Sequence, residues 1–184
     1  MVKVTAGVLN KRSGRVINFK SFRVHGSYNS KTHLHDVALI ELQEDLQFSS
    51  TISPACLPYI WAGQTDTTGQ VLGSGWGVLK ENGNSPDVLM KVILDVIPNN
   101  QCQQKLRSRI DSTQVCTLTP KKDTCQGDSG GSIDASYNGK FYAFGIVSWG
   151  YGCARDNSPG VYARISEYTS WIEQNTGVTS FCKS

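Results

Sequence analysis

Hydrophobic and polar residues alternate in short blocks along most of the chain, which is the pattern of half-buried β-strands. These blocks cover residues 2–9, 15–24, 37–42, 88–97, 114–118, 141–149 and 160–165. Turn residues rather than helix-length segments separate most of them, so neighbouring strands are expected to pair antiparallel. The sequence therefore predicts an all-β protein.

Two segments have helical periodicity. Asn100 is expected to cap a short helix that runs to Arg107. Near the C-terminus, Glu167 and Glu173 accompany three apolar residues at helical spacing, namely Tyr168, Trp171 and Ile172. This pattern predicts a terminal helix whose single apolar stripe packs against the core and does not bind a cofactor.

Composition and charge exclude several classes of protein. The chain has 184 residues, of which 39% are hydrophobic and 18% charged, and it has no apolar run near the ~18 residues of a membrane helix. One domain, or two small lobes, fits this length. Residues 1–35 contain seven Lys or Arg and no acid, but these charges alternate with apolar residues and are expected on a solvated strand face. No nucleic acid and no membrane are therefore expected as partners.

Six cysteines indicate disulfides and an oxidising compartment, so the protein is expected to be secreted. The first residues lack the pattern of a secretory signal. The cysteines form no Cys-x-x-Cys pair, and the histidines at 25, 33 and 35 lie far from most of them in sequence. Neither a metal nor another cofactor is expected.

The candidate chemistry lies in residues 123–131, which read Asp-Thr-Cys-Gln-Gly-Asp-Ser-Gly-Gly. Glycines on both sides of Ser129 would expose its hydroxyl and allow a substrate to approach the backbone. The N–H groups of Gly127 and Ser129 could then stabilise an oxyanion. Taken alone, the segment is equally compatible with an ordinary glycine-rich turn.

This run resembles the nucleophile segment of the trypsin-like (chymotrypsin-fold) serine proteases. Further segments resemble the same family in the same order along nearly the whole chain: residues 35–42, 54–58, 75–77, 148–150, 152–154, 159–162 and 168–172. The resemblance implies a double antiparallel β-barrel with an incomplete first barrel and a C-terminal helix. Residues 1–64 would form the partial N-terminal barrel and the connector between the barrels. Residues 65–184 would form the C-terminal barrel and its helix, together with the first part making one peptidase domain.

The resemblance also assigns roles to individual residues. Ser129 would be the nucleophile, Asp36 the acid that orients a catalytic histidine, and Ser148 a neighbour hydrogen-bonded to that acid. Gly127 and Ser129 would supply the oxyanion hole, and Asp128 would be the acid linked to activation. The substrate pocket would be formed by Asp123, Ser148, Trp149, Gly150 and Gly160.

Cleavage after Arg or Lys follows from this pocket, since glycine walls admit a long side chain and a buried carboxylate needs a cation to offset its desolvation. Protein or peptide substrates with Arg or Lys at the cleavage site are therefore expected, and protein inhibitors are candidate partners.

The resemblance also selects among the 15 ways of pairing six cysteines. It pairs Cys102 with Cys116 and Cys125 with Cys153. Cys56 is left with two alternatives, because in relatives the connector cysteine often holds an upstream segment. It bonds either to such a segment or to Cys182.

The largest departure from the family is the lack of a catalytic histidine. His33 and His35 lie too near Asp36 in sequence for a ring to reach both Asp36 and Ser129, and His25 lies in the preceding loop. In relatives this base comes from a segment upstream of the position of Met1. The sequence is therefore interpreted as an N-terminally truncated protease, inactive as written.

Other interpretations remain open, and the truncation has further expected consequences. A non-catalytic homologue that binds or regulates a partner is the main alternative, and an unrelated secreted β-protein is a third. Asp128 is expected to be a buried carboxylate without its cation, and the incomplete first barrel is expected to expose an apolar face.

Overall fold

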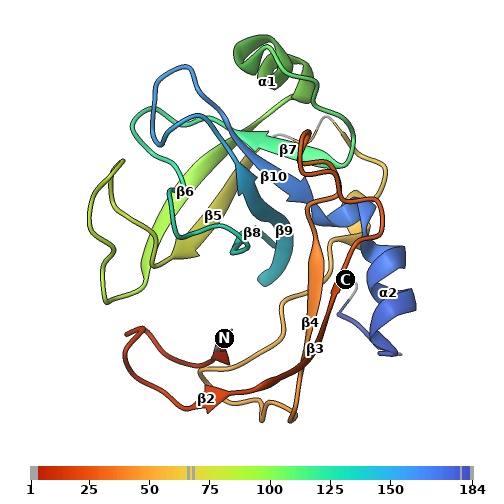
Figure 1. Ribbon diagram of the computed structural model, residues 1–184. Helices are drawn as coiled ribbons and strands as arrows, with labels where there is room; N and C mark the ends of the chain where they lie inside the picture. The colour runs from red at the N-terminus through yellow and green to blue at the C-terminus, as the bar shows by residue number, and fades with distance from the viewer. Residues whose placement is uncertain (1–3, 66, 68, 179, 183–184) are drawn as a thin grey trace.

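The main feature of the computed structural model, which describes residues 4–65, 67, 69–178 and 180–182, is a closed antiparallel β-barrel (Figure 1). Its strands pair in the order β10-β7-β6-β5-β8-β9. Their bounds are β5 Gly69–Gly75, β6 Met90–Ile97, β7 Gln114–Thr117, β8 Ser132–Tyr137, β9 Lys140–Trp149 and β10 Gly160–Arg164. Every adjacent pair is antiparallel, which confirms the predicted all-β class.

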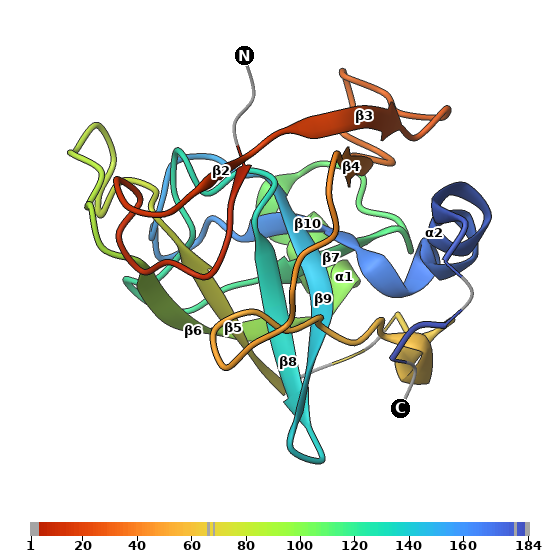
Figure 2. The ribbon, with the colours of Figure 1, turned by 90° about the horizontal axis from the view of Figure 1, so that it is seen from below.

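The N-terminal segment forms two separate two-stranded sheets. The first pairs β1 (Val4–Thr5) with β2 (Val16–Ile17), and the second pairs β3 (Phe19–Val24) with β4 (Ala38–Leu42). Figure 2 shows these strands lying outside the closed barrel. Residues 2 and 3, where the first expected strand begins, lie outside the described residues.

Several predicted boundaries were wrong. The expected strand 15–24 is interrupted at Asn18, and its two parts pair with different partners. The strands β5 and β8 were not predicted, because β5 contains glycines at 69, 73 and 75 and β8 carries a polar Asp134 that blurs the alternation.

Short helices connect and cover the barrel. The helix α1 (Asn99–Leu106) begins directly after Pro98, so Asn100 lies in its first turn and is not the expected cap. Two 3₁₀ turns, η1 (Tyr59–Trp61) and η2 (Ile165–Glu167), lie in the connector and after β10. The terminal helix α2 (Thr169–Thr176) is present, and Ile172 on its inner face is buried as predicted.

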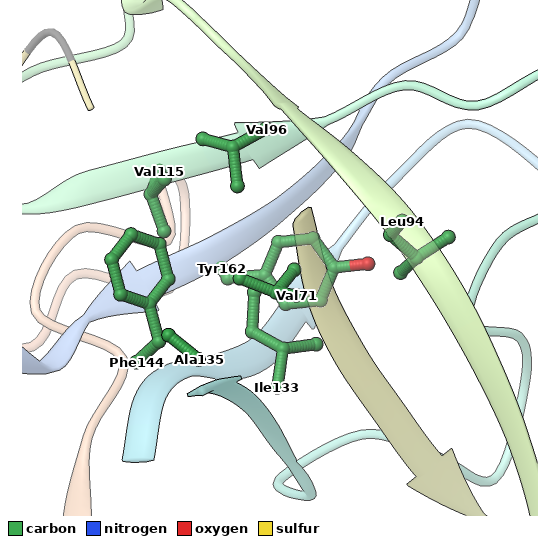
Figure 3. Close-up of a cluster of buried hydrophobic side chains, with 8 residues drawn as sticks. All are labelled: Val71, Leu94, Val96, Val115, Ile133, Ala135, Phe144 and Tyr162. Atoms are coloured by element: carbon green, nitrogen blue, oxygen red, sulfur yellow. The ribbon is translucent and has the colours of Figure 1, made fainter. Parts of the chain in front are cut away.

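The barrel interior is a single apolar cluster contributed by every barrel strand (Figure 3). Its buried members are Val71, Leu94, Val96, Val115, Ile133, Ala135, Phe144 and Tyr162. A second cluster lies under α2, where Tyr168 and Ile172 pack with Ala163, Ile165 and Val37. This second cluster attaches the N-terminal segment to the barrel, because Val37 directly precedes β4.

Basic residues of the N-terminal segment lie at the surface beside carboxylates. Arg15 pairs with Glu44, and Lys20 pairs with Glu41 across the β3–β4 sheet. Arg12 and Lys11 lie beside Asp87. These contacts agree with the interpretation of a solvated strand face. Exposed pairs of this kind contribute about 0–1 kcal/mol each to stability.

The outer face of the β3–β4 sheet carries exposed apolar side chains. Phe22 retains 68% of its accessible surface and Ile40 retains 54%. The two residues face each other across the strand pair, and Val24 is also exposed.

Arg164, at the end of β10, is 1% exposed and ties the connector to the barrel. Its guanidinium donates to the carbonyls of Ser112, Gln114, Gln64 and Thr65 and to side-chain oxygens of Thr67 and Asn99. These acceptors come from the connector, the start of α1 and the turn before β7. One side chain therefore satisfies several carbonyls that are partly or fully withdrawn from water.

Replacing Arg164 by Gln should lower the free energy of unfolding by about 3 kcal/mol, because a fully buried side chain and its partly buried acceptors lose their hydrogen bonds. The melting temperature should fall by roughly 6–12 °C, as measured by calorimetry. The matched control is Arg12→Gln at an exposed pair, which should change stability by less than about 1 kcal/mol. Equal melting temperatures for the two variants would contradict this assignment.

Candidate active site

Ser129 lies at an exposed position in the loop that joins β7 to β8. Gly127 and Gly130 on either side have φ of 98° and 80°, a conformation that favours glycine. The N–H of Gly130 donates to Val147 O at 2.9 Å, which fixes this loop against β9. Among the described residues, neither the Gly127 nor the Ser129 N–H donates a hydrogen bond, so both can serve a ligand.

Asp128 is half-buried, which corrects the expectation of a buried carboxylate. Its two carboxylate oxygens accept the N–H of Gly77 at 2.8 Å and of Cys125 at 3.0 Å. A Cβ on Gly75 or Gly77 would overlap this carboxylate, so the Gly75-Trp76-Gly77 turn leaves the space that Asp128 occupies. The backbone of the chain itself therefore stabilises this charge.

A cavity of about 230 Å³ adjoins Ser129. Asp123, Ser148, Trp149, Gly150 and Gly160 line it, so the structure places the predicted pocket residues around one space together with Ser129. A Cβ on Gly160 would lie 2.9 Å from Asp123 Oδ1, so a side chain there would press on the carboxylate. The glycine walls keep the way to Asp123 open.

Asp123 accepts hydrogen bonds from two backbone amides, Thr124 N at 2.9 Å and Ala154 N at 3.1 Å. The pKa of Asp123 is nevertheless raised to about 6, mainly by burial and slightly by the nearby Asp128 charge, against the opposing effect of the two amides. The carboxylate is thus ionised at neutral pH in a place where ionisation is costly. A cation in the cavity would offset this cost.

Asp36, just before β4, is joined to this region through Ser148. The Ser148 hydroxyl, near the end of β9, donates to Asp36 Oδ2 at 2.6 Å. Ser148 also lines the cavity that Asp123 and Ser129 share. Ser148 therefore links Asp36, which comes from the N-terminal segment, to the cavity that Asp123 and Ser129 line in the barrel.

The three histidines occupy other positions. His25 stacks on His35 with ring centroids 4.9 Å apart, and both rings contact Tyr168, which directly precedes α2. His33 lies beside Trp149, with centroids 5.9 Å apart. In the part of the chain that the structure describes, which includes all three, no histidine hydrogen-bonds to Asp36 or Ser129.

Three disulfides are present, and one ties the nucleophile loop to the pocket wall. Cys125 bonds to Cys153, Cys102 on α1 bonds to Cys116 on β7, and Cys56 bonds to Cys182. Of the two alternatives for Cys56, the structure has the one within this chain. The described residues contain no group of three or more His, Cys, Asp or Glu side chains placed to hold a metal ion. They also contain no helix with the length and apolarity needed to cross a membrane.

Sequence reasoning missed two charged residues beside the pocket. Glu81, in the loop between β5 and β6, accepts hydrogen bonds from Cys153 N and Arg155. Neither residue belongs to a recognisable motif, and they are 74 positions apart. Only the spatial approach of their two loops reveals the contact.

The fold is a closed antiparallel barrel, and Ser129 lies between glycines beside a cavity lined by the Asp123 carboxylate. This combination is typical of one class of protein, the chymotrypsin-like hydrolases. The family model Trypsin matches residues 1–172, and the chain therefore belongs to the trypsin family of serine proteases.

The chain is 38% identical to trypsin-1 of Astacus astacus over 181 residues, which are 95% of this chain and 75% of that protein. It is 39% identical to transmembrane protease serine 11G of Mus musculus over 170 residues, covering 86% of this chain and 39% of that protein. It is also 38% identical to serine proteinase stubble of Drosophila melanogaster over 162 residues, covering 81% and 20% respectively. The chain thus spans three quarters of the first relative and less than half of the other two.

The histidine stack should make the 25–35 loop sensitive to acid. Burial, followed by the nearby His35, lowers the pKa of His25 below its usual 6.5, so the folded state favours the neutral ring. This contribution to stability is complete above pH 6.5 and is lost as the pH falls through the lowered pKa. Amide hydrogen exchange of residues 25–37, corrected for its intrinsic pH dependence, should accelerate between pH 7.5 and 5.

His25→Phe keeps an aromatic ring against Tyr168 and Trp171 but cannot be protonated, and it should reduce this acid response. Corrected exchange rates that are equal at both pH values in the unsubstituted protein would contradict the prediction.

Proposed function

We propose that this chain carries the nucleophile and the substrate-binding pocket of a trypsin-like endopeptidase that cleaves after Arg or Lys. The observation that carries the proposal is the cavity of about 230 Å³ that is lined by Asp123, by Ser129 and by the glycines at 150 and 160. A long cationic side chain could reach the Asp123 carboxylate from this cavity, and its backbone carbonyl would then lie near Ser129.

The proposed chemistry is acyl transfer. The Ser129 oxygen would attack the carbonyl carbon of the peptide bond, and a base would take the hydroxyl proton as the new C–O bond forms. The C–N bond would then break, the base would return the proton to the leaving amine, and water would hydrolyse the resulting ester to release the acid and restore the Ser129 hydroxyl. The free N–H groups of Gly127 and Ser129 would donate to the developing oxyanion. Asp36, held by the Ser148 hydroxyl, would orient and stabilise a histidine base in the manner of the family.

Selectivity for Arg and Lys would come from Asp123. A guanidinium or ammonium group would replace the water that burial removes from this carboxylate, whereas an uncharged side chain would leave the charge without a partner. A pocket with bulky residues at 150 and 160 would be too narrow, and glycine at both positions supports entry of a long side chain.

This chain by itself is proposed to be inactive. Its three histidines are engaged with Tyr168 and Trp149 or with each other, and Asp36 has Ser148 rather than an imidazole as its hydrogen-bond partner. Without a positioned base, Ser129 is an ordinary alcohol. Asp128 is proposed as the acid linked to activation, since its carboxylate joins the Cys125 N–H of its own loop to the Gly77 N–H of the neighbouring turn.

A non-catalytic homologue with a binding or regulatory role is the second candidate function. The placement of the histidines favours it, because the pocket can bind a cationic side chain without performing chemistry. In either case the proposed ligands are proteins or peptides that present Arg or Lys, including protein inhibitors.

The three disulfides support a secreted protein. We propose that residues 1–64 and 65–184 are the two structural parts of one peptidase domain, the second part being the closed barrel with α2.

The pocket should bind benzamidine, a small aromatic amidinium ion, in titration calorimetry at pH 7.5. Asp123→Asn should weaken binding by at least about 30-fold, because the cation loses a buried charged partner. Binding to the unsubstituted protein should weaken as the pH falls through about 6, since protonated Asp123 no longer attracts a cation. Ser129→Ala is the matched control and should bind normally. Equal affinities for the unsubstituted protein and Asp123→Asn would refute the pocket assignment.

The chain should resist labelling by a fluorophosphonate, a reagent that reacts with activated serines. A trypsin with a complete catalytic triad provides the positive control in the same assay. Mass spectrometry should find Ser129 unmodified, because no base takes its proton. Labelling that disappears in Ser129→Ala would contradict the proposed inactivity but would leave the pocket assignment intact.

A further inference from the structure

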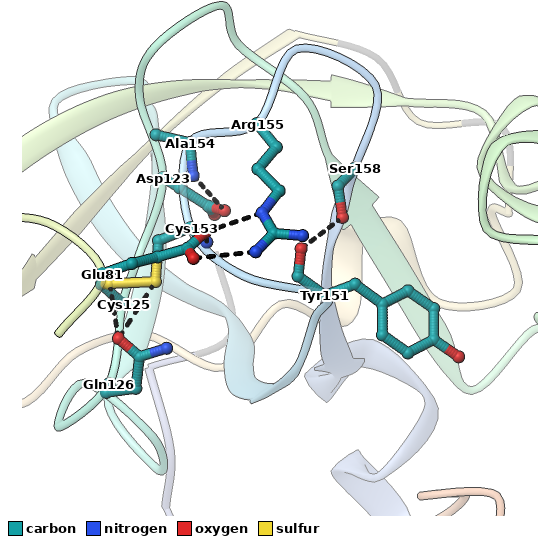
Figure 4. Close-up of polar contacts among 9 residues, drawn as sticks. All are labelled: Glu81, Asp123, Cys125, Gln126, Tyr151, Cys153, Ala154, Arg155 and Ser158. Atoms are coloured by element: carbon teal, nitrogen blue, oxygen red, sulfur yellow. Dashed lines mark hydrogen bonds and ion pairs between the residues drawn. A yellow bond between two sulfur atoms is a disulfide. The ribbon is translucent and has the colours of Figure 1, made fainter.

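Glu81 contacts the wall of the Asp123 pocket from a loop that belongs to another part of the barrel (Figure 4). Its Oε1 accepts the N–H of Cys153 at 2.8 Å and Arg155 Nε at 2.8 Å, and its Oε2 accepts Arg155 Nη2 at 2.8 Å. The pairing with Arg155 is bidentate, which fixes direction as well as distance. One carboxylate thus holds the residues on both sides of Ala154.

Ala154 is the residue that these contacts enclose, and its backbone is strained. Its φ of 56° lies in the left-handed region, which costs a non-glycine residue roughly 1–2 kcal/mol. Its N–H donates to Asp123 Oδ2 at 3.1 Å (Figure 4). Such a conformation persists when neighbouring contacts impose it, and here the Cys125–Cys153 disulfide and Glu81 do so.

The backbone at Gly152, next to Cys153, also lies close to the Glu81–Arg155 ion pair. Its φ is 79°, and a Cβ there would lie 2.2 Å from Glu81 Oε1 and 2.3 Å from Arg155 Nε. The ion pair therefore rests directly on the chain at Gly152. Gly152 also lines the cavity shared by Asp123 and Ser129, so the ion pair contacts the backbone of the pocket wall.

Global stability does not account for this pair. The Arg155 side chain is 60% exposed and the Glu81 side chain 30%, and pairs this exposed contribute little to global stability. The three hydrogen bonds that Glu81 accepts instead act locally, on residues 152–155. The Arg155 guanidinium and the Cys153 N–H lower the pKa of Glu81 to about 2, so this carboxylate is charged throughout the neutral range.

We propose that Glu81 is a positioning residue of the Asp123 pocket: it fixes Cys153 and Arg155 so that the strained Ala154 directs its N–H at the Asp123 carboxylate. The inference rests on the proposed function, because it concerns the same pocket. It assigns a role in cation binding to a residue outside the pocket lining.

The consequence of losing Glu81 follows from the charge balance around Asp123. Among the described residues, the backbone amides of Thr124 and Ala154 are the groups that oppose its desolvation, so losing the Ala154 donor should raise the pKa of Asp123 further. Asp128 and the Tyr162 hydroxyl face Asp123 from neighbouring elements. The adjoining cavity, of about 580 Å³, also brings charged side chains near, namely Lys80, Glu81, Lys91, Lys121 and Lys122.

The test uses the full chain and compares Glu81→Ala with Glu44→Ala, which also removes a carboxylate from an arginine partner but does not line either pocket cavity. Two readouts are needed. Carbon-13 NMR follows the ionisation of the Asp123 carboxyl in the free protein, and titration calorimetry measures benzamidine binding at pH 7.5.

In Glu81→Ala the Asp123 carboxyl should titrate at a higher pH than in the unsubstituted protein, and benzamidine should bind about tenfold more weakly, as expected for one lost hydrogen bond to a charged group. Glu81→Gln can still accept the Cys153 N–H but cannot pair with Arg155 as an ion. Its Asp123 titration and its benzamidine affinity should therefore lie between those of Glu81→Ala and those of the unsubstituted protein. Melting temperatures should stay close to that of the unsubstituted protein. Glu44→Ala should match the unsubstituted protein in every readout.

An unchanged Asp123 titration in Glu81→Ala would overturn the inference, and so would a loss of benzamidine binding accompanied by general unfolding. Failure of the proposed function looks different. In that case the unsubstituted protein itself would not bind benzamidine, while the NMR titration of Asp123 in the Glu81 variants would still decide whether Glu81 acts on this carboxylate.

Discussion

The site depends on a partly buried carboxylate that is ionised at neutral pH although burial disfavours its charge. Asp123 accepts two backbone hydrogen bonds, but these do not compensate for the hydration that its charge loses on burial, and its pKa is therefore raised to about 6. Because the folded pKa exceeds the unfolded one, this group reduces stability as the pH rises from about 4 to about 6. The folded protein thus carries a local cost that a bound cation can offset, which is how a pocket gains selectivity at the expense of stability.

The rest of the pocket serves to hold that carboxylate in place. The Cys125–Cys153 disulfide joins its loop to the opposite wall, and the glycines at 150 and 160 leave the approach open. The segment around Ala154 supplies an amide only because its backbone is held in a conformation it would not adopt freely. Rigid strands β9 and β10 lie on either side of this irregular segment, so the barrel anchors both ends of the wall.

The two parts of the molecule contribute unequally to the site. The closed barrel supplies Ser129, Asp123 and the pocket walls and contains most of the buried apolar residues. The N-terminal segment supplies Asp36, which reaches the site through the Ser148 hydroxyl, and it is attached through Val37 under α2. Its outer face, with Phe22 and Ile40, remains exposed. The position of Asp36 therefore relies on a few contacts, whereas that of Ser129 relies on the barrel.

The sequence by itself determined the all-β class and the antiparallel pairing, because alternation and turn residues are local signals. The glycine-rich run pointed to Ser129, and the other candidate residues came from the resemblance to trypsin-like proteases. Sequence reasoning missed β5 and β8, whose glycines and polar residues obscure the alternation, and it left the partner of Cys56 open. The resemblance implied that Ser148 is hydrogen-bonded to Asp36 and lines the pocket with Asp123, and the tertiary structure supplies the Ser148–Asp36 contact and the cavity that Ser148 lines with Ser129 and Asp123. The tertiary structure alone brought Glu81 to Arg155, since the approach of two loops 74 residues apart depends on barrel closure and leaves no trace in either loop's sequence.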